Sequence, residues 1–186
     1  MDIQVDSREK SKAIHKILSE FDNQGVRWYV SKLPWGDYMN LDNPRLIIDR
    51  KQNLTELTNN VIQDHKRFVS ELEKAKEHGV KLIILVEHGG MIKSLDDVIW
   101  WKNPRSEKRV KGEDGKWHTE LVVYKREIVD KRTNNKYTRE FHPTTGLELY
   151  KILVTMQEKY DVSFQFCDKR QTGKRIIDIL NNYKVV

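Results

Sequence analysis

The chain has 186 residues, 38% of them hydrophobic and 33% charged, and it carries a net charge of +6. That length fits a single domain over 1–186, and the apolar share suffices for one modest core. No run approaches the roughly 20 apolar residues of a membrane span, and the first residues lack a signal-peptide pattern. The only cysteine, Cys167, excludes an internal disulfide and a cysteine-rich zinc site. We therefore expect a cytoplasmic protein without membrane contact, and its positive charge favours a polyanion, nucleic acid first, as partner.

Strand-like and helix-like segments alternate along the first half of the chain. Alternating apolar residues predict strands, and apolar residues three to four positions apart predict amphipathic helices. The expected elements are a strand around Ile3 and Val5, a helix over 10–22, a strand over 26–33, a hairpin of 36–40 and 45–49 turning at 42–44, a long helix over 54–78 and a buried strand over 81–87. Gly79 is expected to end the long helix. The strand after it is expected to run parallel to the hairpin strand before it.

The alternation returns after residue 143. We expect a helix over 146–160, a strand over 162–167 and a helix over 171–183. Together with the first half, these segments predict an α/β fold with a three-layer core, in which helices flank a central mixed sheet on both faces.

The segment 90–143 differs from the rest of the chain in composition. Between residues 102 and 140 it holds twelve Lys or Arg against seven Asp or Glu, a balance of +5. Strand-like runs over 121–129 and 136–141, joined by a turn, predict an inserted basic β-hairpin arm. A basic segment on a nearly neutral body is typical of a nucleic-acid contact.

Basic and aromatic residues are interleaved in this segment. The cations that we assign to nucleic-acid binding are Lys102, Arg105, Lys108, Arg109 and Lys111. Three tryptophans lie among them, namely Trp100, Trp101 and Trp117. These rings either stack on bases, anchor the arm to the core, or bury a dimer contact.

Two short motifs carry the strongest chemical signal. Gly36-Asp37-Tyr38 opens one arm of the expected hairpin, and Asp49-Arg50-Lys51 closes the apolar run of the other. Charged residues at the end of a buried strand are unfavourable unless they bind something or reach an edge. Asp49 and Lys51 are two positions apart on a strand and so project from one face, whereas Arg50 points the other way.

Asp37, Asp49 and Lys51 match the needs of a metal site that cleaves a phosphodiester. Two carboxylates hold Mg²⁺ or Mn²⁺ and leave positions for water and phosphate oxygens. A nearby lysine stabilises developing charge, or positions or deprotonates the attacking water. A solvated strand end with a salt bridge explains the same spacing equally well.

Other candidate residues have simpler explanations. Asp6 and Glu9 fit a third acidic contribution, with Arg8 on a phosphate, but they also fit a capping box for the first helix. Glu56 has the same spacing from an asparagine at the start of the long helix, and the residues alone favour capping at both places. His65 either faces the metal site or borders the core.

These motifs, in this order, resemble the nuclease domain of the XPF-type (ERCC4-domain) family of structure-selective endonucleases. The matching segments are Val5 to Glu9, Gly36 to Tyr38, Ile48 to Lys51, Arg67-Phe68 and Leu82 to Glu87, and the C-terminal helix–strand–helix is similar as well. The resemblance implies a restriction-endonuclease-like fold and Mg²⁺- or Mn²⁺-dependent cleavage of branched or flapped DNA. The residues that it assigns are Asp37 and Asp49 as metal ligands, Lys51 as the catalytic lysine with Arg50 beside it, and Asp6, Arg8 and Glu9 in the same cleft. We assign Arg8 and Arg67 to nucleic-acid binding.

Three departures accompany the resemblance. Asp49 stands where the family usually has glutamate, Thr55 stands where it has aspartate, and no tandem helix-hairpin-helix module follows before Val186. DNA is then expected to be engaged by the basic arm, by a homodimer or by a partner protein. A compact chain of this kind suits a phage or mobile element acting in a host cytoplasm. Two rival functions remain, a non-catalytic DNA-binding module with the same fold and an RNA-directed nuclease.

Overall fold

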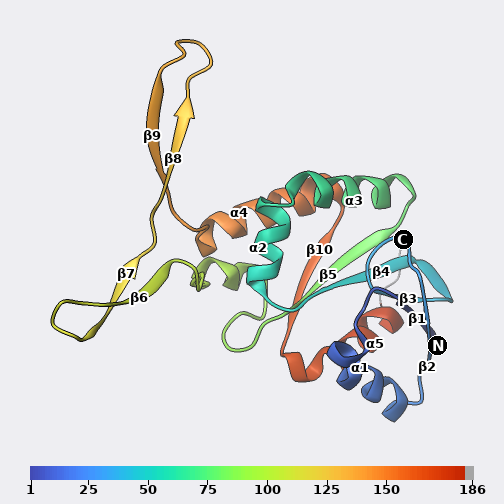
Figure 1. The fold of residues 1–186 in the computed structure, drawn as a ribbon. Coiled ribbons are helices and arrows are strands. Elements are labelled where there is room, and N and C mark those ends of the chain that lie inside the picture. The colour runs from blue at the N-terminus through green and yellow to red at the C-terminus, as the bar shows by residue number, and fades with distance from the viewer. Residues whose placement is uncertain (183–186) are drawn as a thin grey trace.

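A six-stranded mixed sheet forms the centre of the structure, a computed structural model that describes residues 1–182 (Figure 1). The strands lie in the order β10-β5-β4-β3-β1-β2. Their bounds are β1 Asp2–Asp6, β2 Arg27–Ser31, β3 Tyr38–Asn40, β4 Asn43–Lys51, β5 Lys81–Glu87 and β10 Ser163–Cys167. β1 is parallel to β2, β4 to β5 and β5 to β10, whereas β3 is antiparallel to both β1 and β4.

Helices cover both faces of this sheet, which confirms the predicted three-layer α/β core (Figure 1). The helices are α1 Ser11–Asn23 and α5 Thr172–Asn182 on one face, and α2 Leu54–Ile62, α3 His65–Glu77 and α4 Gly146–Tyr160 on the other. Two short 3₁₀ turns complete the helical elements, η1 Asp96–Trp100 after β5 and η2 Lys169–Gln171 before α5. Tyr183, the predicted last residue of the final helix, lies outside the described residues.

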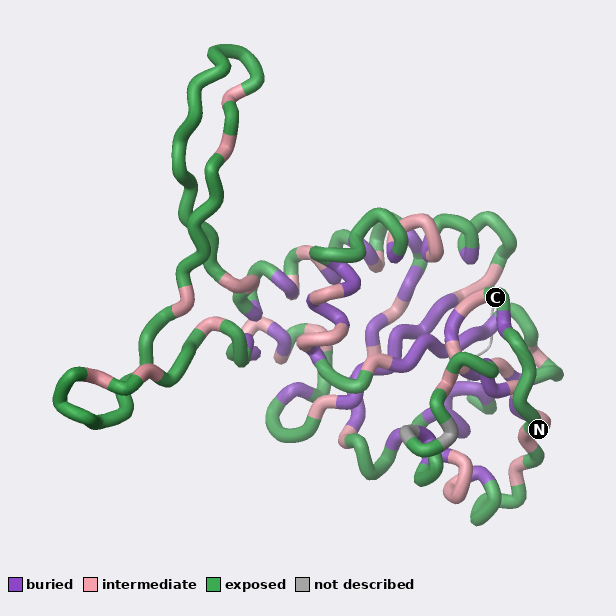
Figure 2. Tube along the Cα trace, viewed as in Figure 1, coloured by how far each residue is buried: buried purple, intermediate pink, exposed green. Residues whose placement is uncertain are grey.

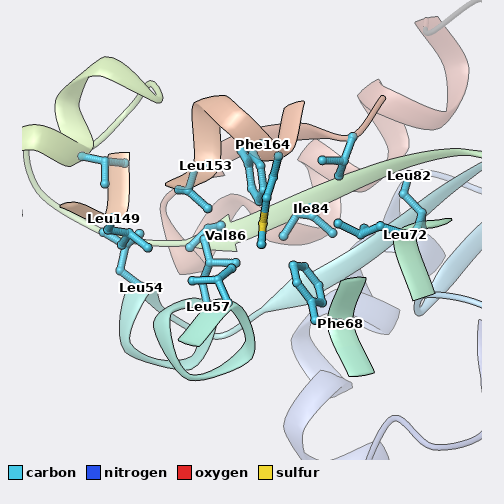
Figure 3. Packing of buried hydrophobic residues seen from close by; sticks show 14 of the residues in the cluster. Leu54, Leu57, Phe68, Leu72, Leu82, Ile84, Val86, Leu149, Leu153 and Phe164 are labelled. Carbon is cyan, nitrogen blue, oxygen red and sulfur yellow. The ribbon is translucent and has the colours of Figure 1, made fainter. Parts of the chain in front are cut away.

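The period-two alternation of β4 assigns its side chains to the two layers. Leu46 and Ile48 pack with α1 and α5, whereas Ile47 packs with α2, α3 and α4. Figure 3 shows the second of these cores, with labels on Leu54, Leu57, Phe68, Leu72, Leu82, Ile84, Val86, Leu149, Leu153 and Phe164. Truncating one of these buried leucines to alanine would cost about 2–5 kcal/mol. Both cores thus fix the position of β4.

The helix predicted over 54–78 is wrong, because two helices occupy this range. The Asn59 carbonyl accepts hydrogen bonds from the N–H groups of both Gln63 (2.8 Å) and Asp64 (3.0 Å). The imidazole Nδ1 of His65 bonds to the Val61 carbonyl at 3.0 Å, the acceptor that a continuous helix would use for its own backbone. The apolar spacing runs on across the break because α2 and α3 pack into the same core.

The hairpin before α2 turns one residue earlier than predicted. Its turn residues are Leu41 and Asp42, while Pro44 already lies in β4. β3 is accordingly short, and the register between β3 and β4 shifts at Met39/Asn40. These boundaries leave the two acidic motifs at the same end of the hairpin.

The segment 90–143 forms two hairpins rather than the one that was predicted. β6 Glu107–Lys111 pairs with β7 Trp117–Leu121, and β8 Tyr124–Val129 pairs with β9 Lys136–Phe141. The strand predicted over 121–129 is divided between the two hairpins, since β7 ends at Leu121 and β8 begins at Tyr124. The Val122 N–H donates to the Ser106 carbonyl at 2.9 Å and so extends the pairing of the first hairpin. Both hairpins project from the body, and Figure 2 shows them exposed along most of their length. We call residues 107–141 the arm.

The root of the arm packs into the body. Trp101 and Val98 are buried in the core with α4, so Trp101 is an anchor rather than a stacking platform. Gly146, the first residue of α4, has no room for a side chain, since a Cβ would lie 2.4 Å from the Val98 carbonyl oxygen. Trp100 and Trp117 are exposed. No helix within residues 1–182 has both the length and the apolar composition needed to cross a lipid bilayer.

Candidate active site

The C-terminal end of β4 places two of the predicted site residues on one face of the sheet. Asp49 and Lys51 continue the Ile47 side of the strand, which faces α2 and α3. The Lys51 ammonium lies 5.8 Å from the centroid of the Phe68 ring on α3. Its Nζ is 2.8 Å from both carboxylate oxygens of Asp49. The strand alternation alone therefore brings an acid and a lysine together.

A tight turn brings Asp37 to the same place. Gly36 has φ +56°, and a Cβ on it would lie 2.6 Å from Ile47 Cγ2 and 2.8 Å from the Ile48 carbonyl oxygen. Only glycine fits this close approach in the left-handed region. The Asp37 N–H donates to the Ile48 carbonyl at 2.7 Å, and the Arg50 N–H donates to Asp37 Oδ2 at 2.7 Å. Asp37 thus lies against the same few residues of β4 that carry Asp49.

The two aspartates interact electrostatically. Burial raises the pKa of Asp37 well above its ordinary value, and the charges of Asp49 and Glu9 raise it further. Burial alone would lower the pKa of the Lys51 ammonium, but Asp49, Asp37 and Glu56 outweigh it, so this pKa is raised. Lys51 is therefore a cation at neutral pH. The carboxylates around it carry more negative charge than this one ammonium group neutralises.

Glu71 on α3 also belongs to this site, and the sequence analysis missed it. Its carboxylate accepts a hydrogen bond from the Gly36 N–H, and its pKa is raised by burial and by the charge of Asp49. Glu71 lies one turn after Arg67 and next to the core residue Leu72, so helical spacing places it at the edge of the buried face. The sequence does not show that this edge meets the Gly36 turn.

Arg50 lies on the opposite face of β4, as the alternation predicts. Its guanidinium bonds to Glu9 Oε2 at 2.8 and 3.1 Å and to Glu87 Oε1 at 3.1 Å. Tyr38 also donates to Glu9, and Thr172 donates to Glu87. Arg50 and Glu87 are almost completely buried. The structure thus places Arg50 and Glu9 in a network behind the site, and Glu87 is a member that sequence reasoning did not single out.

The Asp6 carboxylate pairs with Arg8 and does not cap a helix. Its carboxylate accepts hydrogen bonds from the Arg8 N–H, Nε and Nη2 and from the Leu33 N–H, at 2.6 to 3.1 Å. Burial raises the pKa of Asp6, but these hydrogen bonds outweigh it and leave the pKa below its ordinary value. The capping box predicted for Asp6 and Glu9 is wrong, because α1 begins only at Ser11.

The capping predicted at the start of α2 is confirmed. The Asn53 side chain accepts a hydrogen bond from the Glu56 N–H at 2.8 Å and caps α2, while the Glu56 carboxylate accepts from the Gln52 N–H. Glu56 is nevertheless close enough to Lys51 to affect its charge. His65 is occupied by the Val61 carbonyl at the break between α2 and α3.

The predicted nucleic-acid contacts differ in how free they are. Arg8 is paired with Asp6, and Arg67 lies 3.5 Å from Asp64, yet both side chains are more than half exposed. The remaining predicted contacts are exposed, and they are Lys102, Arg105, Lys108, Arg109 and Lys111. Of these, Arg105 donates to Asn59 Oδ1 at 2.8 Å and Lys108 pairs with Glu120 at 3.3 Å.

Asp37 and Asp49 fit a hard divalent cation. Both offer carboxylate oxygens, and the pKa of Asp37 is raised by burial and then by neighbouring negative charge, which a cation would neutralise. No three His, Cys, Asp or Glu side chains among residues 1–182 form a complete metal cage. Mg²⁺ does not require one, because it commonly binds through one or two carboxylates, several waters and substrate phosphates.

Comparison with known proteins agrees with this geometry. A model of the ERCC4 domain family matches residues 5–180. No curated protein matches the chain. The solved structure of XPF from Aeropyrum pernix aligns with a TM-score of 0.54 at 18% identity, over 96% of this chain and 64% of that one. XPF from Aeropyrum pernix in complex with DNA aligns with a TM-score of 0.56 at 17% identity, over 96% of this chain and 62% of that one.

These likenesses have different weight. At such identities the XPF structures show the fold, and this chain spans less than two-thirds of their length. The family match covers nearly the whole described chain and confirms the resemblance seen in the motifs around Asp37 and Asp49. The chain belongs to the ERCC4-domain family.

Proposed function

We propose that this protein is a metal-dependent endonuclease that cleaves phosphodiester bonds in branched, flapped or otherwise structured DNA. The observation that carries the proposal is the meeting of Asp37, Asp49 and the Lys51 ammonium at one end of β4. Membership of the ERCC4-domain family supports it. So does the fold shared with XPF, a protein whose structure has been solved with DNA.

Asp37 and Asp49 would hold the Mg²⁺ or Mn²⁺ ion. The bound ion would polarise the phosphodiester and lower the pKa of a water molecule. The Arg50 N–H and the Gly36 turn keep the Asp37 carboxylate in place before any ion arrives. Lys51, being cationic, would donate hydrogen bonds to a phosphate oxygen and stabilise its growing charge rather than remove a proton.

Asp6, Glu9 and Arg50 would act from behind the site. Asp6 holds Arg8, whose partly exposed guanidinium would contact a phosphate. Glu9 and Arg50 would position β4 through their partly buried ion pair. We assign these three residues to positioning rather than to contact with the reacting atoms.

DNA would be held by Arg8 and Arg67 near the site and by the basic arm farther away. Neutralised phosphates release counterions, so affinity should fall steeply as salt rises. A homodimer or a partner protein could extend this surface. We propose that the protein acts in the cytoplasm.

The test is a cleavage assay on flap, fork and four-way DNA with Mg²⁺ or Mn²⁺. Wild-type protein should cut at least one substrate, and Asp37→Ala and Asp49→Ala should abolish cutting. Asp42→Ala, at the exposed turn between β3 and β4, is the matched control and should cut normally. Equal cutting by wild type and Asp49→Ala would overturn the proposal.

The rival functions give distinct results in the same experiments. A non-catalytic module would bind DNA, while calorimetry would detect no Mn²⁺ binding that depends on Asp49. An RNA-directed nuclease would cut a matched RNA substrate in preference to DNA. Either result would replace the proposed activity.

A further inference from the structure

The hairpin β8–β9 has one face on which charges are balanced. Side chains alternate between the faces of a strand, so the register Lys125↔Glu140 and Val129↔Lys136 places these residues on a common face. Two ion pairs lie there, Lys125–Glu140 at 3.2 Å and Lys136–Glu127 at 2.9 Å. This face has its own counter-charges.

The other face of β8–β9 carries unpaired arginines between aromatic rings. Arg126 and Arg139 lie directly opposite each other, and neither has a carboxylate partner among residues 1–182. Arg139 lies over the Phe141 ring, 5.4 Å from its centroid. The cross-strand pairs on either side of the arginines are Tyr124↔Phe141 and Ile128↔Tyr137. Like charges opposite one another destabilise a hairpin, so the two arginines do not stabilise the fold. Their arrangement suits the binding of an anionic ligand.

The hairpin β6–β7 repeats the same division. On one face Lys108 pairs with Glu120 at 3.3 Å, and His118 contacts Asp114 at 3.0 Å. The opposite face carries Arg109 and Lys111 together with Trp117, and it ends at Glu107, which lies opposite Leu121. The Arg109 guanidinium lies 5.7 Å from the centroid of the Trp117 ring. Two independent hairpins thus each separate paired charges from an aromatic–cationic face.

We propose that the face of Tyr124, Arg126, Tyr137, Arg139 and Phe141 binds a single-stranded segment of DNA, with the Arg109–Trp117 face as its continuation. This inference rests on the proposed function, because it names the part of a branched substrate that the arm would hold. We call the five residues the stacking face.

The chemistry of the stacking face favours unpaired bases over a duplex. Tyr124 and Tyr137 are 52% and 48% exposed, and Trp117 is 61% exposed. Exposed rings of this kind stack on bases, which a duplex keeps stacked on one another, while arginines contact the backbone. Along β9, Tyr137 and Phe141 lie about 13 Å apart with Arg139 between them. Ring, cation and ring therefore alternate along the strand.

A second copy of the chain is a poorer occupant of this face. Two stacking faces would bring four arginines together without a counter-charge, and like charges juxtaposed at an interface disfavour association. A nucleic-acid strand supplies both the negative charges and the aromatic surfaces that the face lacks.

Contacts at the root of the arm connect the stacking face to the helix that follows the catalytic centre. Tyr124 lines a cavity of about 240 Å³ at the root of the arm, together with Asn59 of α2 and Arg105. Arg105 donates to Asn59, and α2 begins three residues after Lys51. A single strand of DNA held on the arm would thus pass α2, whose N-terminus adjoins the end of β4 that carries Asp49 and Lys51.

The experiment compares two pairs of substitutions in the full chain. Arg126→Gln/Arg139→Gln removes two positive charges from the stacking face, and Lys125→Gln/Lys136→Gln removes two from the balanced face of the same hairpin. Binding of a labelled 20-nucleotide single strand and of the matching duplex is measured by fluorescence anisotropy across a salt series. Divalent cations are left out, so that cleavage plays no part.

We expect the arginine pair to lower single-strand affinity about tenfold or more. The slope of log affinity against log salt should fall in magnitude by roughly 1.4, since each phosphate contact on a single strand accounts for about 0.7. The lysine pair should change both quantities much less. Tyr137→Ala should weaken single-strand binding about fivefold or more and leave the salt slope unchanged.

Three results would overturn the inference. Equal losses from the arginine and lysine pairs would mean that only total charge matters. Equal losses for duplex and single strand would place the binding in a groove rather than on the rings. Self-association in sedimentation, abolished by the arginine pair, would make the face a contact between copies. Circular dichroism melts check that all variants fold alike.

Failure here is distinguishable from failure of the proposed nuclease activity. Asp49→Asn should keep single-strand binding while it loses cleavage. If no protein form cuts DNA yet the arginine pair still weakens single-strand binding selectively, the activity is wrong and the stacking face stands.

Discussion

The ammonium nitrogen of Lys51 lies 2.8 Å from each carboxylate oxygen of Asp49, so one cation already spans the carboxylate that a metal ion would need. Both side chains project from the same face of β4 because they are two positions apart. An arriving divalent ion would therefore compete with the lysine for Asp49. In the proposed chemistry this exchange frees Lys51 to donate to the phosphate.

Replacing Lys51 separates metal binding from chemistry. Lys51→Ala removes both the competing cation and the donor to the phosphate. We expect Mn²⁺ affinity measured by calorimetry to stay equal or rise, while single-turnover cleavage falls about 10²–10³-fold. Lys66→Ala, at an exposed position on α3, is the control and should change neither. A loss of Mn²⁺ affinity in Lys51→Ala would contradict the competition between the two cations.

The raised pKa of Asp37 predicts a site that destabilises the metal-free fold. The folded state holds the proton more tightly than the unfolded chain, whose carboxyl has its ordinary value of 3.8. This destabilisation is absent below that value, grows as pH rises above it, and is complete once the pH passes the raised folded-state pKa. Asp37→Asn should therefore raise the melting temperature at pH 7 without metal, and the gain should vanish near pH 3.

Divalent ions provide the matching control for Asp37. Adding Mn²⁺ should raise the melting temperature of the wild type and leave that of Asp37→Asn nearly unchanged. Asp42→Asn should behave as the wild type does in both conditions. A lower melting temperature for metal-free Asp37→Asn at pH 7 would show that the aspartate is not under electrostatic strain.

The close approach of Gly36 to β4 predicts that a larger residue at this position destabilises the protein. Gly36 and Gly25 both have positive φ, +56° and +64°, so alanine at either position costs about 1–2 kcal/mol of backbone strain. A Cβ on Gly36 would also overlap Ile47 and the Ile48 carbonyl, whereas nothing lies within 4 Å of a Cβ on Gly25. Chemical denaturation should show Gly36→Ala as the less stable by about 1–3 kcal/mol.

The same glycine pair also reports on chemistry. The overlap would push Asp37 away from Asp49, so Gly36→Ala should lose cleavage even at temperatures where it stays folded. Gly25→Ala should cut as the wild type does. Equal stability and equal activity of the two variants would mean that the turn adjusts freely.

We predict that Glu71, on α3, stabilises the Gly36 turn. Glu71→Ala removes the acceptor of the Gly36 N–H and should cost about 1–2 kcal/mol of stability. Glu71→Gln keeps an acceptor but removes the charge near Asp49. At pH 7 it should be at least as stable as the wild type, because the raised pKa of Glu71 means that its charge is unfavourable in the folded state. Any change in Mn²⁺ affinity would then measure the charge alone. Equal stability of Glu71→Ala and the wild type, measured in urea, would exclude the support.

Short-range patterns predicted most of the sheet and half of the site. The alternation from Leu46 to Lys51 was enough to place Asp49 and Lys51 on one face and Arg50 on the other, because a strand repeats every two residues. The apolar run of β5 likewise predicted a buried parallel strand. These features depend only on neighbours along the chain.

The parts that the sequence did not predict depend on where elements meet. The Asp6–Glu9 spacing fits a capping box, yet the Leu33 N–H, 27 residues away, is one of the donors that hold Asp6. Glu71 on α3 meets the Gly36 turn, which lies 35 residues before it in the chain. Val122 bonds to Ser106 at the base of the first hairpin, and the second hairpin begins only at Tyr124. Such contacts have no periodic signal.

The arrangement of β4 has a consequence for how this protein can tolerate mutation. Shifting the strand by one residue would turn Asp49 and Lys51 into the layer of α1 and α5 and would expel Arg50 from its two carboxylates. Folding and chemistry would then be lost in a single event. Gene variants with inserted or deleted codons should therefore survive in the turns at the tips of the arm, at 112–116 and 130–135, and disappear between Leu46 and Lys51.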